Sequence, residues 1–383
     1  MIYLDNAATT PPFDEVVDVV TEAMRKNFGN PSSLHHLGVQ AEEVLEQSRS
    51  TLAEALQVEP EEVFFTSGGT EANNMVLKGA ARALRKKGRH IISTAVEHKS
   101  VINTLHALDE EGFEIDFLPV SREGIVDLQV LEDAVREDTI LVSIMHVNNE
   151  TGAIQPVDRV EEILRRRGSK ALLHVDAVQS FAKVPLHPHL SGIDLLTLSA
   201  HKIHGPKGVG AIFRRKGVRV APLLAGGRQE KGLRGGTENL PGIAGFEKAV
   251  QRNFEQIFEK QHQMNHLRNM LLSGLTEAFK DVVINTPDDR SAAPHILNAS
   301  FPGLKGEVLM RKLETAGIYA STGSACTSGS GAPSHVLKAM GRTQQEVQGT
   351  LRFSLSAMNG EEDVHQVMEH LVPVVKRLRA MGR

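Results

Sequence analysis

The sequence predicts an α/β protein with a mostly parallel central sheet and a second, smaller α+β region. The chain has 383 residues, more than one hydrophobic core usually serves, so we expect two domains. Hydrophobic residues make up 40% of the chain and charged residues 23%, which fits a packed globular protein and excludes a disordered chain. Short β-branched runs alternate with helical periodicity, the pattern of helices that cross over a parallel sheet.

The expected strands of the large sheet are short apolar runs, at residues 63–66, 90–95, 113–119, 140–147, 171–177 and 195–200. Helical stretches lie between most of these runs. In the first of them, residues 70–88, the periodicity places Val76, Ala80, Ala83 and Leu84 on one apolar helix face. Each strand therefore leads into a helix, as parallel pairing requires.

Residues 241–275 keep helical periodicity for longer than a typical globular helix, and we place a domain boundary inside this stretch. Beyond it the elements become shorter: a strand at 295–302, a helix at 307–316, a Gly/Ser-rich loop at 322–331, a strand at 350–356 and a helix from 361. Pro373 should kink or interrupt this last helix.

The charges nearly balance, with 43 Lys and Arg against 47 Asp and Glu, so no broad basic field is available for nucleic acid or an anionic membrane. We expect a small-molecule partner instead. The N-terminus has no signal-peptide pattern and no run has membrane-spanning length, which predicts a cytoplasmic protein. Scattered histidine pairs lack further ligands at metal-site spacing, so we expect no resident metal.

A lysine follows the end of the strand expected at 195–200. Lys202 stands in a string, residues 198–208, that runs from this strand into a Gly-rich turn. A lysine held at such a point can form a Schiff base with an aldehyde, and burial can make its amine a base. Taken alone, an ordinary solvated lysine is the more common interpretation.

A carboxylate ends the strand expected at 171–177. Asp176 lies among apolar residues and therefore needs a partner if it is buried. An aspartate in this position can hold the protonated ring nitrogen of pyridoxal phosphate, while an amide such as Gln179 reaches the ring oxygen. A helix N-cap by Asp176 is an equally good interpretation of this string alone.

Residues 66–73 form a Gly-rich turn between a strand and a helix. Small residues let the backbone approach a ligand, and the helix N-terminus presents N–H groups to an anion, so the turn suits a phosphate. The alternative is a simple capped turn. The spacing matches neither a P-loop nor a dinucleotide-binding turn.

A phosphate site, a ring-nitrogen acid and a Schiff-base lysine are together the parts that a pyridoxal phosphate enzyme needs. The chain resembles the class V aminotransferase-like cysteine desulfurases of the NifS/IscS type along almost its whole length. The matching segments are residues 3–11, 29–38, 67–71, 97–98, 146–152, 176–179, 199–202, 232–239, 323–326 and 351–354.

The resemblance implies a role for individual residues. Lys202 corresponds to the lysine that binds the cofactor covalently, His98 to the imidazole stacked on its ring, and Asp176 and Gln179 to the partners of the ring nitrogen and oxygen. Asn149 corresponds to a residue beside the ring that helps to hold the substrate. The expected phosphate ligands are Gly69, Thr70, Ser199 and His201.

The resemblance also implies a homodimer, because Thr237 would complete the phosphate site of the neighbouring subunit. Arg352 corresponds to the residue that pairs with the substrate carboxylate, for which a planar guanidinium is suited. The only cysteine, Cys326, cannot form an intramolecular disulfide. A solitary cysteine is often a small buried hydrophobe, but this one stands in a polar loop without apolar periodicity, which favours a nucleophile.

The implied fold is that of pyridoxal phosphate enzymes of fold type I. A large seven-stranded α/β domain would comprise residues 12–257, and a smaller α+β domain would comprise residues 1–11 and 258–383 and carry the Cys326 loop.

The implied reaction converts L-cysteine to L-alanine and leaves the sulfur on Cys326 as a persulfide. Lys202 would remove the substrate Cα proton, and His98 and Lys202 would help to return a proton before alanine leaves. A sulfur acceptor protein would then receive the sulfur, for iron–sulfur cluster assembly or another use. The one metal species expected at Cys326 is an iron–sulfur cluster bound there transiently. IscS-type chains continue past the last helix with a tail that helps to dock the scaffold protein, whereas this chain stops at Arg383, so the acceptor stays open.

Three alternatives remain at this point. The same scaffold serves selenocysteine lyases and aminotransferases, and the Cys326 loop argues against the second but not the first. A sulfur-relay or scaffold-binding subunit without its own catalysis is the third. The intact set of Lys202, Asp176, His98 and Arg352 argues against it.

Overall fold

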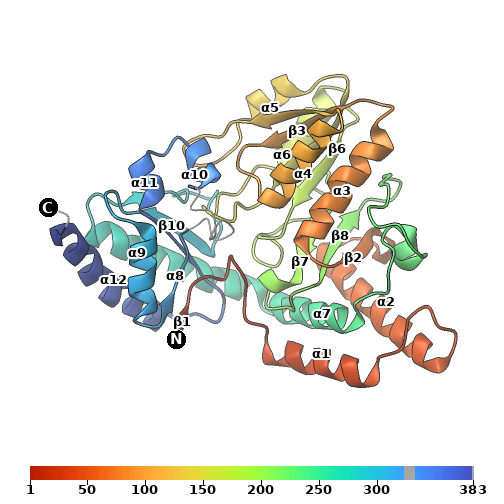
Figure 1. Cartoon of the computed structure of the whole chain (residues 1–383), viewed down its shortest axis with the longest axis horizontal. Coiled ribbons are helices and arrows are strands. Elements are labelled where there is room, and N and C mark those ends of the chain that lie inside the picture. Colours follow the sequence, from red (N-terminus) through yellow and green to blue (C-terminus); the bar gives the residue numbers. More distant parts are fainter. Residues whose placement is uncertain (323–332, 382–383) are drawn as a thin grey trace.

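The computed structural model describes residues 1–322 and 333–381, so Cys326 lies outside the described residues. The larger part of the molecule is built on a seven-stranded sheet with the order β2-β8-β7-β6-β5-β3-β4 (Figure 1). Its strands are β2 (Val63–Thr66), β3 (His90–Thr94), β4 (Glu114–Leu118), β5 (Thr139–Met145), β6 (Leu172–Asp176), β7 (Leu195–Ser199) and β8 (Gly210–Arg214). All six strands that the sequence predicted are present, within one or two residues of their expected ends.

The sheet is mostly parallel, as predicted. The neighbours from β7 through β6, β5 and β3 to β4 all pair in parallel, whereas β8 is antiparallel to both β7 and β2. Strand β8 was not predicted, because its short run between a Gly-rich turn and a basic segment lacks a strong strand pattern. Its reversal lets β2 join the sheet in the same direction as the parallel strands.

Helices cover both faces of this sheet. On β2 the side chains of Val63 and Phe65 enter one hydrophobic cluster and that of Phe64 enters the other, as the two-residue period of a strand requires. One face packs against α1 (Asp14–Lys26), α2 (His36–Leu56), α6 (Asp158–Arg166) and α7 (Leu240–Phe254). The other face packs against α3 (Gly69–Leu84) and α4 (Lys99–Glu110).

The helix expected at residues 70–88 is α3, and its apolar face differs from the prediction at one position. Val76, Ala80 and Leu84 are buried, but Ala83 is exposed, and Ala81 is buried in its place. The buried side of α3 is wider than a single stripe because the helix lies against strands and against α4 at once.

The long helical stretch expected at 241–275 is two helices, so its continuity was wrongly predicted. The first, α7, ends at Phe254, and α8 (Ile257–Ala278) begins three residues later. Gln256 between them has a φ of 55°, a left-handed conformation that ends α-helical geometry. The division of the chain at residue 257 into two domains stays a prediction.

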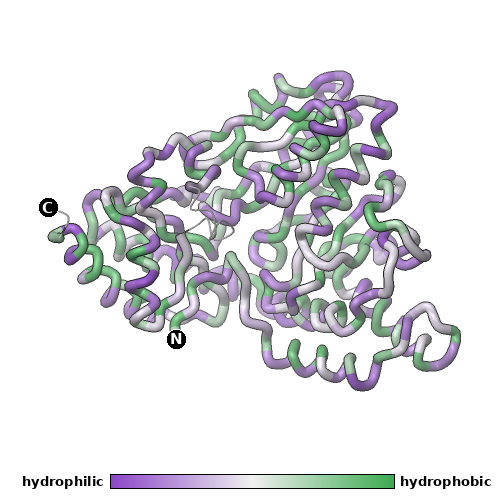
Figure 2. Tube along the Cα trace, in the orientation of Figure 1, coloured by the Kyte–Doolittle hydropathy of each residue, from purple (hydrophilic) through white to green (hydrophobic). Residues whose placement is uncertain are grey.

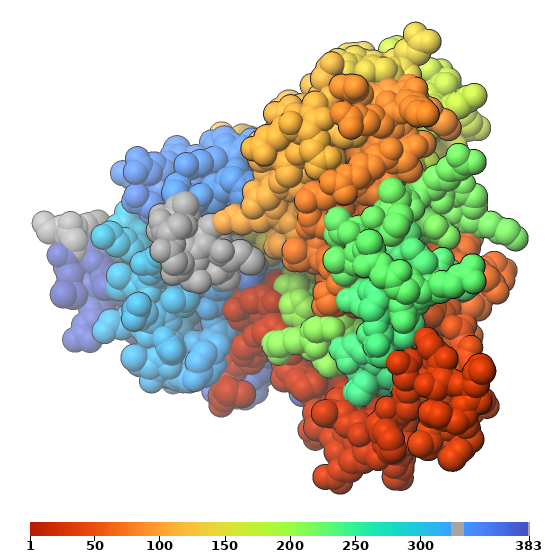
Figure 3. Space-filling model, turned by 45° about the vertical axis from the view of Figure 1, so that its right-hand side comes forward, coloured from red at the N-terminus to blue at the C-terminus, as the bar shows by residue number. Residues whose placement is uncertain are grey.

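A smaller antiparallel sheet, with the order β12-β10-β9, lies beside the large one. It consists of β9 (Val283–Ile284), β10 (Ile296–Ser300) and β12 (Thr350–Ser354), and shares a hydrophobic cluster with α8, α9 (Gly306–Glu314) and α12 (Glu361–Met381). The chain start joins this region, because β1 (Ile2–Tyr3) pairs in parallel with β11 (Ile318–Tyr319). Figure 3 shows the N-terminal segment, in red, between the C-terminal region and the large α/β region.

The last helix runs from Glu361 to Met381 with Pro373 inside it, so Pro373 does not interrupt it, and the kink expected as the alternative stays a prediction. Leu371 and Val375, on either side of the proline, are both buried in the cluster of the smaller sheet. Their packing outweighs the lost backbone hydrogen bond.

Apolar residues, green in Figure 2, concentrate along the strands and the inner faces of the helices. Among the helices of the described part of the chain, none combines the length and hydropathy needed to cross a membrane. The remaining helices are short: α5 (Leu128–Ala134), α10 (His335–Ala339) and α11 (Gln344–Gln348).

Candidate active site

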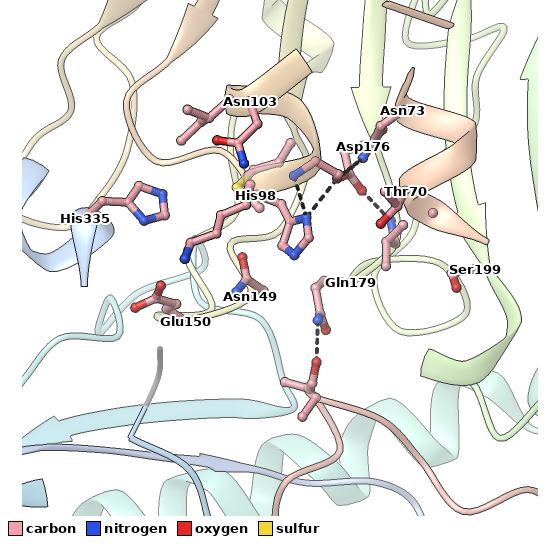
Figure 4. A pocket seen from close by; sticks show the side chains of 18 of the residues that line it. Thr70, Asn73, His98, Asn103, Asn149, Glu150, Asp176, Gln179, Ser199 and His335 are labelled. Atoms are coloured by element: carbon pink, nitrogen blue, oxygen red, sulfur yellow. Dashed lines mark hydrogen bonds between the residues drawn. The ribbon is translucent and has the colours of Figure 1, made fainter. Parts of the chain in front are cut away.

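A cavity of about 750 Å³ opens at the carboxyl ends of the parallel strands, where ligands of open α/β sheets bind. The segments that follow β2, β3, β5, β6 and β7 all contribute to it, and the N-terminal segment, Arg352 and the start of α10 complete its wall. Ten of the residues selected from the sequence line this cavity: Gly69, Thr70, His98, Asn149, Asp176, Gln179, Ser199, His201, Lys202 and Arg352. Figure 4 labels six of them, Thr70, His98, Asn149, Asp176, Gln179 and Ser199.

One end of the cavity has the features of an anion site. Gly68 has a φ of 146°, a conformation open to glycine, and it leads directly into the N-terminus of α3 at Gly69. The hydroxyl of Ser199 is buried at the same end and has no hydrogen-bond partner within the described residues. A helix N-terminus beside an unsatisfied buried hydroxyl fits a phosphate group.

Asp176 ends β6 with its side chain buried, as the sequence predicted. Its Oδ1 accepts from the backbone N–H of Val178 at 3.0 Å, and its Oδ2 accepts from Nδ2 of Asn73 at 2.8 Å. The carboxylate caps the turn that follows β6 and also lines the cavity, whereas its expected contact with a cofactor ring nitrogen stays a prediction.

The N-terminal segment holds two of the predicted side chains. Gln179 Nε2 donates to the carbonyl oxygen of Ala7 at 2.8 Å (Figure 4), and its buried Oε1 has no partner among the described residues. The ammonium of Lys202 donates to the carbonyl oxygens of Ala7 and Ala8 at 2.6 and 2.7 Å. Lys202 ends a short 3₁₀ helix after β7, so its backbone is fixed by the sheet.

His201 and His98 bring two imidazoles to the cavity. Burial, and then the charges of Lys202, Lys207 and Lys183, lower the pKa of His201 to about 4. At neutral pH the ring is therefore uncharged, and it offers a neutral hydrogen bond beside the anion site. Burial likewise lowers the pKa of His98. The expected stacking of His98 on a cofactor ring stays a prediction.

Arg352 lies in β12 with its side chain 2% exposed. Its Nη2 pairs with Oδ1 of Asp5 at 2.7 Å, its Nη1 donates to the carbonyl oxygen of Asn149 at 2.8 Å, and its Nε is without a partner within the described residues. Asp5 and Asn149 thus fix the direction of the guanidinium. The unpartnered Nε leaves a donor for an anionic ligand.

Two buried carboxyl groups at the site have no role in the sequence analysis. Glu150 lines the cavity and accepts from the hydroxyl of Ser334 at 2.5 Å, and burial raises its pKa to about 7. Glu97 precedes His98 and accepts from Thr94 and from the N–H of Met145, and burial raises its pKa to about 8. Both residues stand in segments that matched the family, which was the available signal.

Thr237 does not line the cavity. It is exposed and contributes to a separate small depression beside Ser67 and Arg234. Its expected part in the phosphate site of a neighbouring subunit stays a prediction. No group of three or more His, Cys, Asp or Glu side chains is arranged to hold a metal ion in residues 1–322 and 333–381.

Comparisons with known proteins agree with this geometry. The family model described as aminotransferase class-V matches residues 2–367. A cysteine desulfurase IscS from Methanosarcina thermophila is 44% identical over 100% of this chain and 93% of its own length. Cysteine desulfurase IscS 1 from Archaeoglobus fulgidus is 42% identical, with 100% and 99% covered.

Among solved structures, a NifS-like protein is 41% identical, covers 98% of this chain and 99% of its own, and superposes with a TM-score of 0.92. This likeness confirms the fold predicted from the sequence, that of pyridoxal phosphate enzymes of fold type I. The chain therefore belongs to the class-V aminotransferase family, whose members depend on pyridoxal phosphate.

Proposed function

We propose that this protein is a cysteine desulfurase, which converts L-cysteine to L-alanine and places the sulfur on Cys326 as a persulfide. The supporting observation is that one cavity combines Lys202 and Asp176 with an anion end at Ser199 and with the buried guanidinium of Arg352. The full-length relatives named cysteine desulfurase support the same reaction.

The residues present fit pyridoxal phosphate. Gly69, Thr70, Ser199 and His201 would hold its phosphate, and the unsatisfied Ser199 hydroxyl would gain its missing partner there. Asp176 would hold the ring nitrogen protonated, and Gln179 would hold the ring oxygen. When bound, the cofactor supplies an electron sink next to the substrate Cα.

Lys202 is the proposed base. Its ammonium is held by the carbonyl oxygens of Ala7 and Ala8, which places the amine against the N-terminal wall of the cavity. With the cofactor bound, its Nζ would remove the proton from the substrate Cα. The same amine returns a proton to carbon later in the cycle.

Arg352 is the proposed partner of the substrate α-carboxylate. The guanidinium is fixed by Asp5 and by the carbonyl oxygen of Asn149, so that its orientation exists before the substrate arrives. Asn149 would support the substrate at the same point. A fixed, planar donor group gives the substrate one orientation and places its Cα proton toward the base.

The sulfur step requires a thiolate on Cys326, which lies outside the described residues. The thiolate attacks the substrate sulfur, a sulfur–sulfur bond forms, and the substrate carbon–sulfur bond breaks. The electron pair of the broken bond stays with the substrate carbon, which takes up a proton to become the methyl group of alanine. The sulfur is oxidised to the persulfide level and the carbon is reduced by the same two electrons.

The proposal extends to the assembly and its surroundings. The exposed Thr237, away from the cavity of its own subunit, is available to a second copy of the chain in a homodimer. A sulfur acceptor protein would take the persulfide sulfur, for iron–sulfur cluster assembly or another use. The cytoplasm suits this chemistry because a free thiol stays reduced there.

The test is alanine and sulfide release from L-cysteine by the purified protein with a thiol reductant. The proposal predicts equal amounts of both products from the wild-type protein and neither from Cys326→Ser. Cofactor-loaded protein that forms neither product would contradict it. Alanine with selenide from L-selenocysteine only, or amino-group transfer to a keto acid, would identify the alternative reactions of the same scaffold.

A further inference from the structure

The imidazole of His98 caps the N-terminus of α4. The backbone N–H of Ser100 donates to Nδ1 of His98 over 3.1 Å. A backbone amide can only donate, so Nδ1 must be the acceptor nitrogen of the ring. A neutral imidazole with an acceptor Nδ1 carries its hydrogen on Nε2. The local backbone therefore selects one tautomer of His98.

A chain of side-chain hydrogen bonds reinforces this selection (Figure 4). Nδ2 of Asn73 donates one hydrogen to Oδ2 of Asp176 and the other to Oγ of Ser100, each over 2.8 Å. The Ser100 hydroxyl, which accepts from Asn73, directs its own hydrogen to Nδ1 of His98, also at 2.8 Å. An ionised Asp176 accepts only, and this fixes the direction of every bond from Asp176 to His98.

The surroundings of the ring oppose a positive charge. Asn73, Ser100 and Asp176 are 1%, 8% and 5% exposed, so the chain runs through the protein interior. The N-terminus of α4 disfavours a cation at its cap. Of the titratable groups that face His98, Asp176 on β6 favours the imidazolium. Lys202 after β7, His335 on α10 and Lys99 on α4 disfavour it, and burial adds the largest contribution to the lowered pKa.

We propose that Asn73 and Ser100 are positioning residues that hold His98 as the neutral Nε2–H tautomer, so that His98 acts in the cavity as a hydrogen-bond donor. A proton can be added to this ring only at Nδ1, where the two donors of Ser100 already stand. Proton exchange with the substrate carbon then falls to Lys202 alone. This assignment rests on the proposed function, and it narrows the part expected for His98 in returning the proton.

The test is nitrogen NMR of the cofactor-loaded protein labelled with ¹⁵N-histidine. The chain has 17 histidines, and loss of a signal in His98→Gln identifies the one from His98. We expect Nδ1 without a proton and Nε2 with one between about pH 6 and 8, the range in which an ordinary histidine titrates. A proton on Nδ1, or an imidazolium within that range, would overturn the proposal.

Two variants show whether the Ser100 hydroxyl itself, rather than the folding of α4, sets the pKa of His98. Ser100→Ala keeps the backbone donor but removes the hydroxyl, so the pKa of His98 should rise, because the neutral ring loses a hydrogen bond. The matched control is Thr104→Val, since the Thr104 hydroxyl donates to the carbonyl oxygen of Ser100 within α4. Its His98 titration should equal the wild type. Equal titrations in all three proteins would refute the role of Ser100.

The NMR measurement requires no turnover. If the protein forms no alanine from L-cysteine, the proposed function is refuted. The role of Asn73 and Ser100 is decided separately, by the tautomer that the NMR measurement shows. Asn73→Ala supplies the second link: it removes the donor that holds Ser100 and Asp176 together, and should raise the pKa of His98 as Ser100→Ala does. An unchanged His98 titration in Asn73→Ala would confine the effect to α4 and contradict a chain that reaches Asp176.

Discussion

Replacing Arg352 by lysine tests the proposed carboxylate site most severely. The guanidinium uses Nη2 for Asp5 and Nη1 for the carbonyl oxygen of Asn149. Its Nε has no partner within the described residues, and the proposal assigns it to the substrate carboxylate. A lysine ammonium is a single point charge, so from β12 it cannot bind Asp5, the carbonyl oxygen of Asn149 and the substrate at once. A hydrogen bond to a charged group contributes about 1.5–3 kcal/mol, so Arg352→Lys should raise the KM for L-cysteine about 10- to 150-fold.

The assay is initial-rate alanine formation over a range of L-cysteine concentrations, with cofactor content measured in the same samples. Arg268→Lys is the matched control, because Arg268 is also buried and donates to the carbonyl oxygen of Ala293, away from the cavity. Its KM should stay at the wild-type value although its melting temperature falls. A KM for Arg352→Lys within about twofold of the wild type, less than 0.5 kcal/mol, would refute the carboxylate role.

Three further predictions follow from the site. Lys202→Ala should lose about 10²–10⁴-fold in alanine formation, the usual contribution of a positioned base, and a rate near the wild type would exclude Lys202 as that base. Ser199→Ala removes a buried hydroxyl that has no partner within the described residues, so the cofactor-free protein should melt at a higher temperature. Its pyridoxal phosphate should bind more weakly by absorbance titration, and tighter binding would contradict the phosphate assignment. Burial raises the pKa of Glu97 from 4.5 to about 8 in the folded state. Between these values the folded protein holds one more proton than the unfolded chain, so the contribution of Glu97 to stability falls as the pH rises through this range. Glu97→Gln keeps an acceptor for Thr94 and Met145 without titrating, and its melting temperature should fall less than that of the wild type between about pH 5 and 8; equal falls would show that Glu97 is ionised throughout.

The strands and several site residues were predictable because their pattern is local. Asp176 ends a strand, and Lys202 follows one, whose burial is visible in the sequence, and parallel strands bring their carboxyl ends to one edge. The turn before α3 was recognisable from its glycines in the same way. These positions needed no knowledge of distant parts of the chain.

The remaining features depend on contacts between distant segments. Asp5 meets Arg352 across 347 positions of sequence, and Ser334 meets Glu150 across 184, so no local pattern indicates either pair. The raised pKa of Glu150 comes from its burial, which its neighbours in the sequence do not indicate. The break at Gln256 was missed because a left-handed glutamine has no sequence signature comparable to glycine. Helices α1 and α2 were not predicted, although the acidic first turn and basic last turn of α1 indicate a helix.

The central claim is that sulfur passes from L-cysteine to Cys326. The most direct measurement is mass spectrometry of the cofactor-loaded protein after L-cysteine is added without reductant, with peptide mapping of the only cysteine. The account predicts one added sulfur atom on the Cys326 peptide and one alanine released per subunit, and neither in Cys326→Ser. Alanine released in that stoichiometry from protein whose Cys326 peptide keeps its original mass would contradict it.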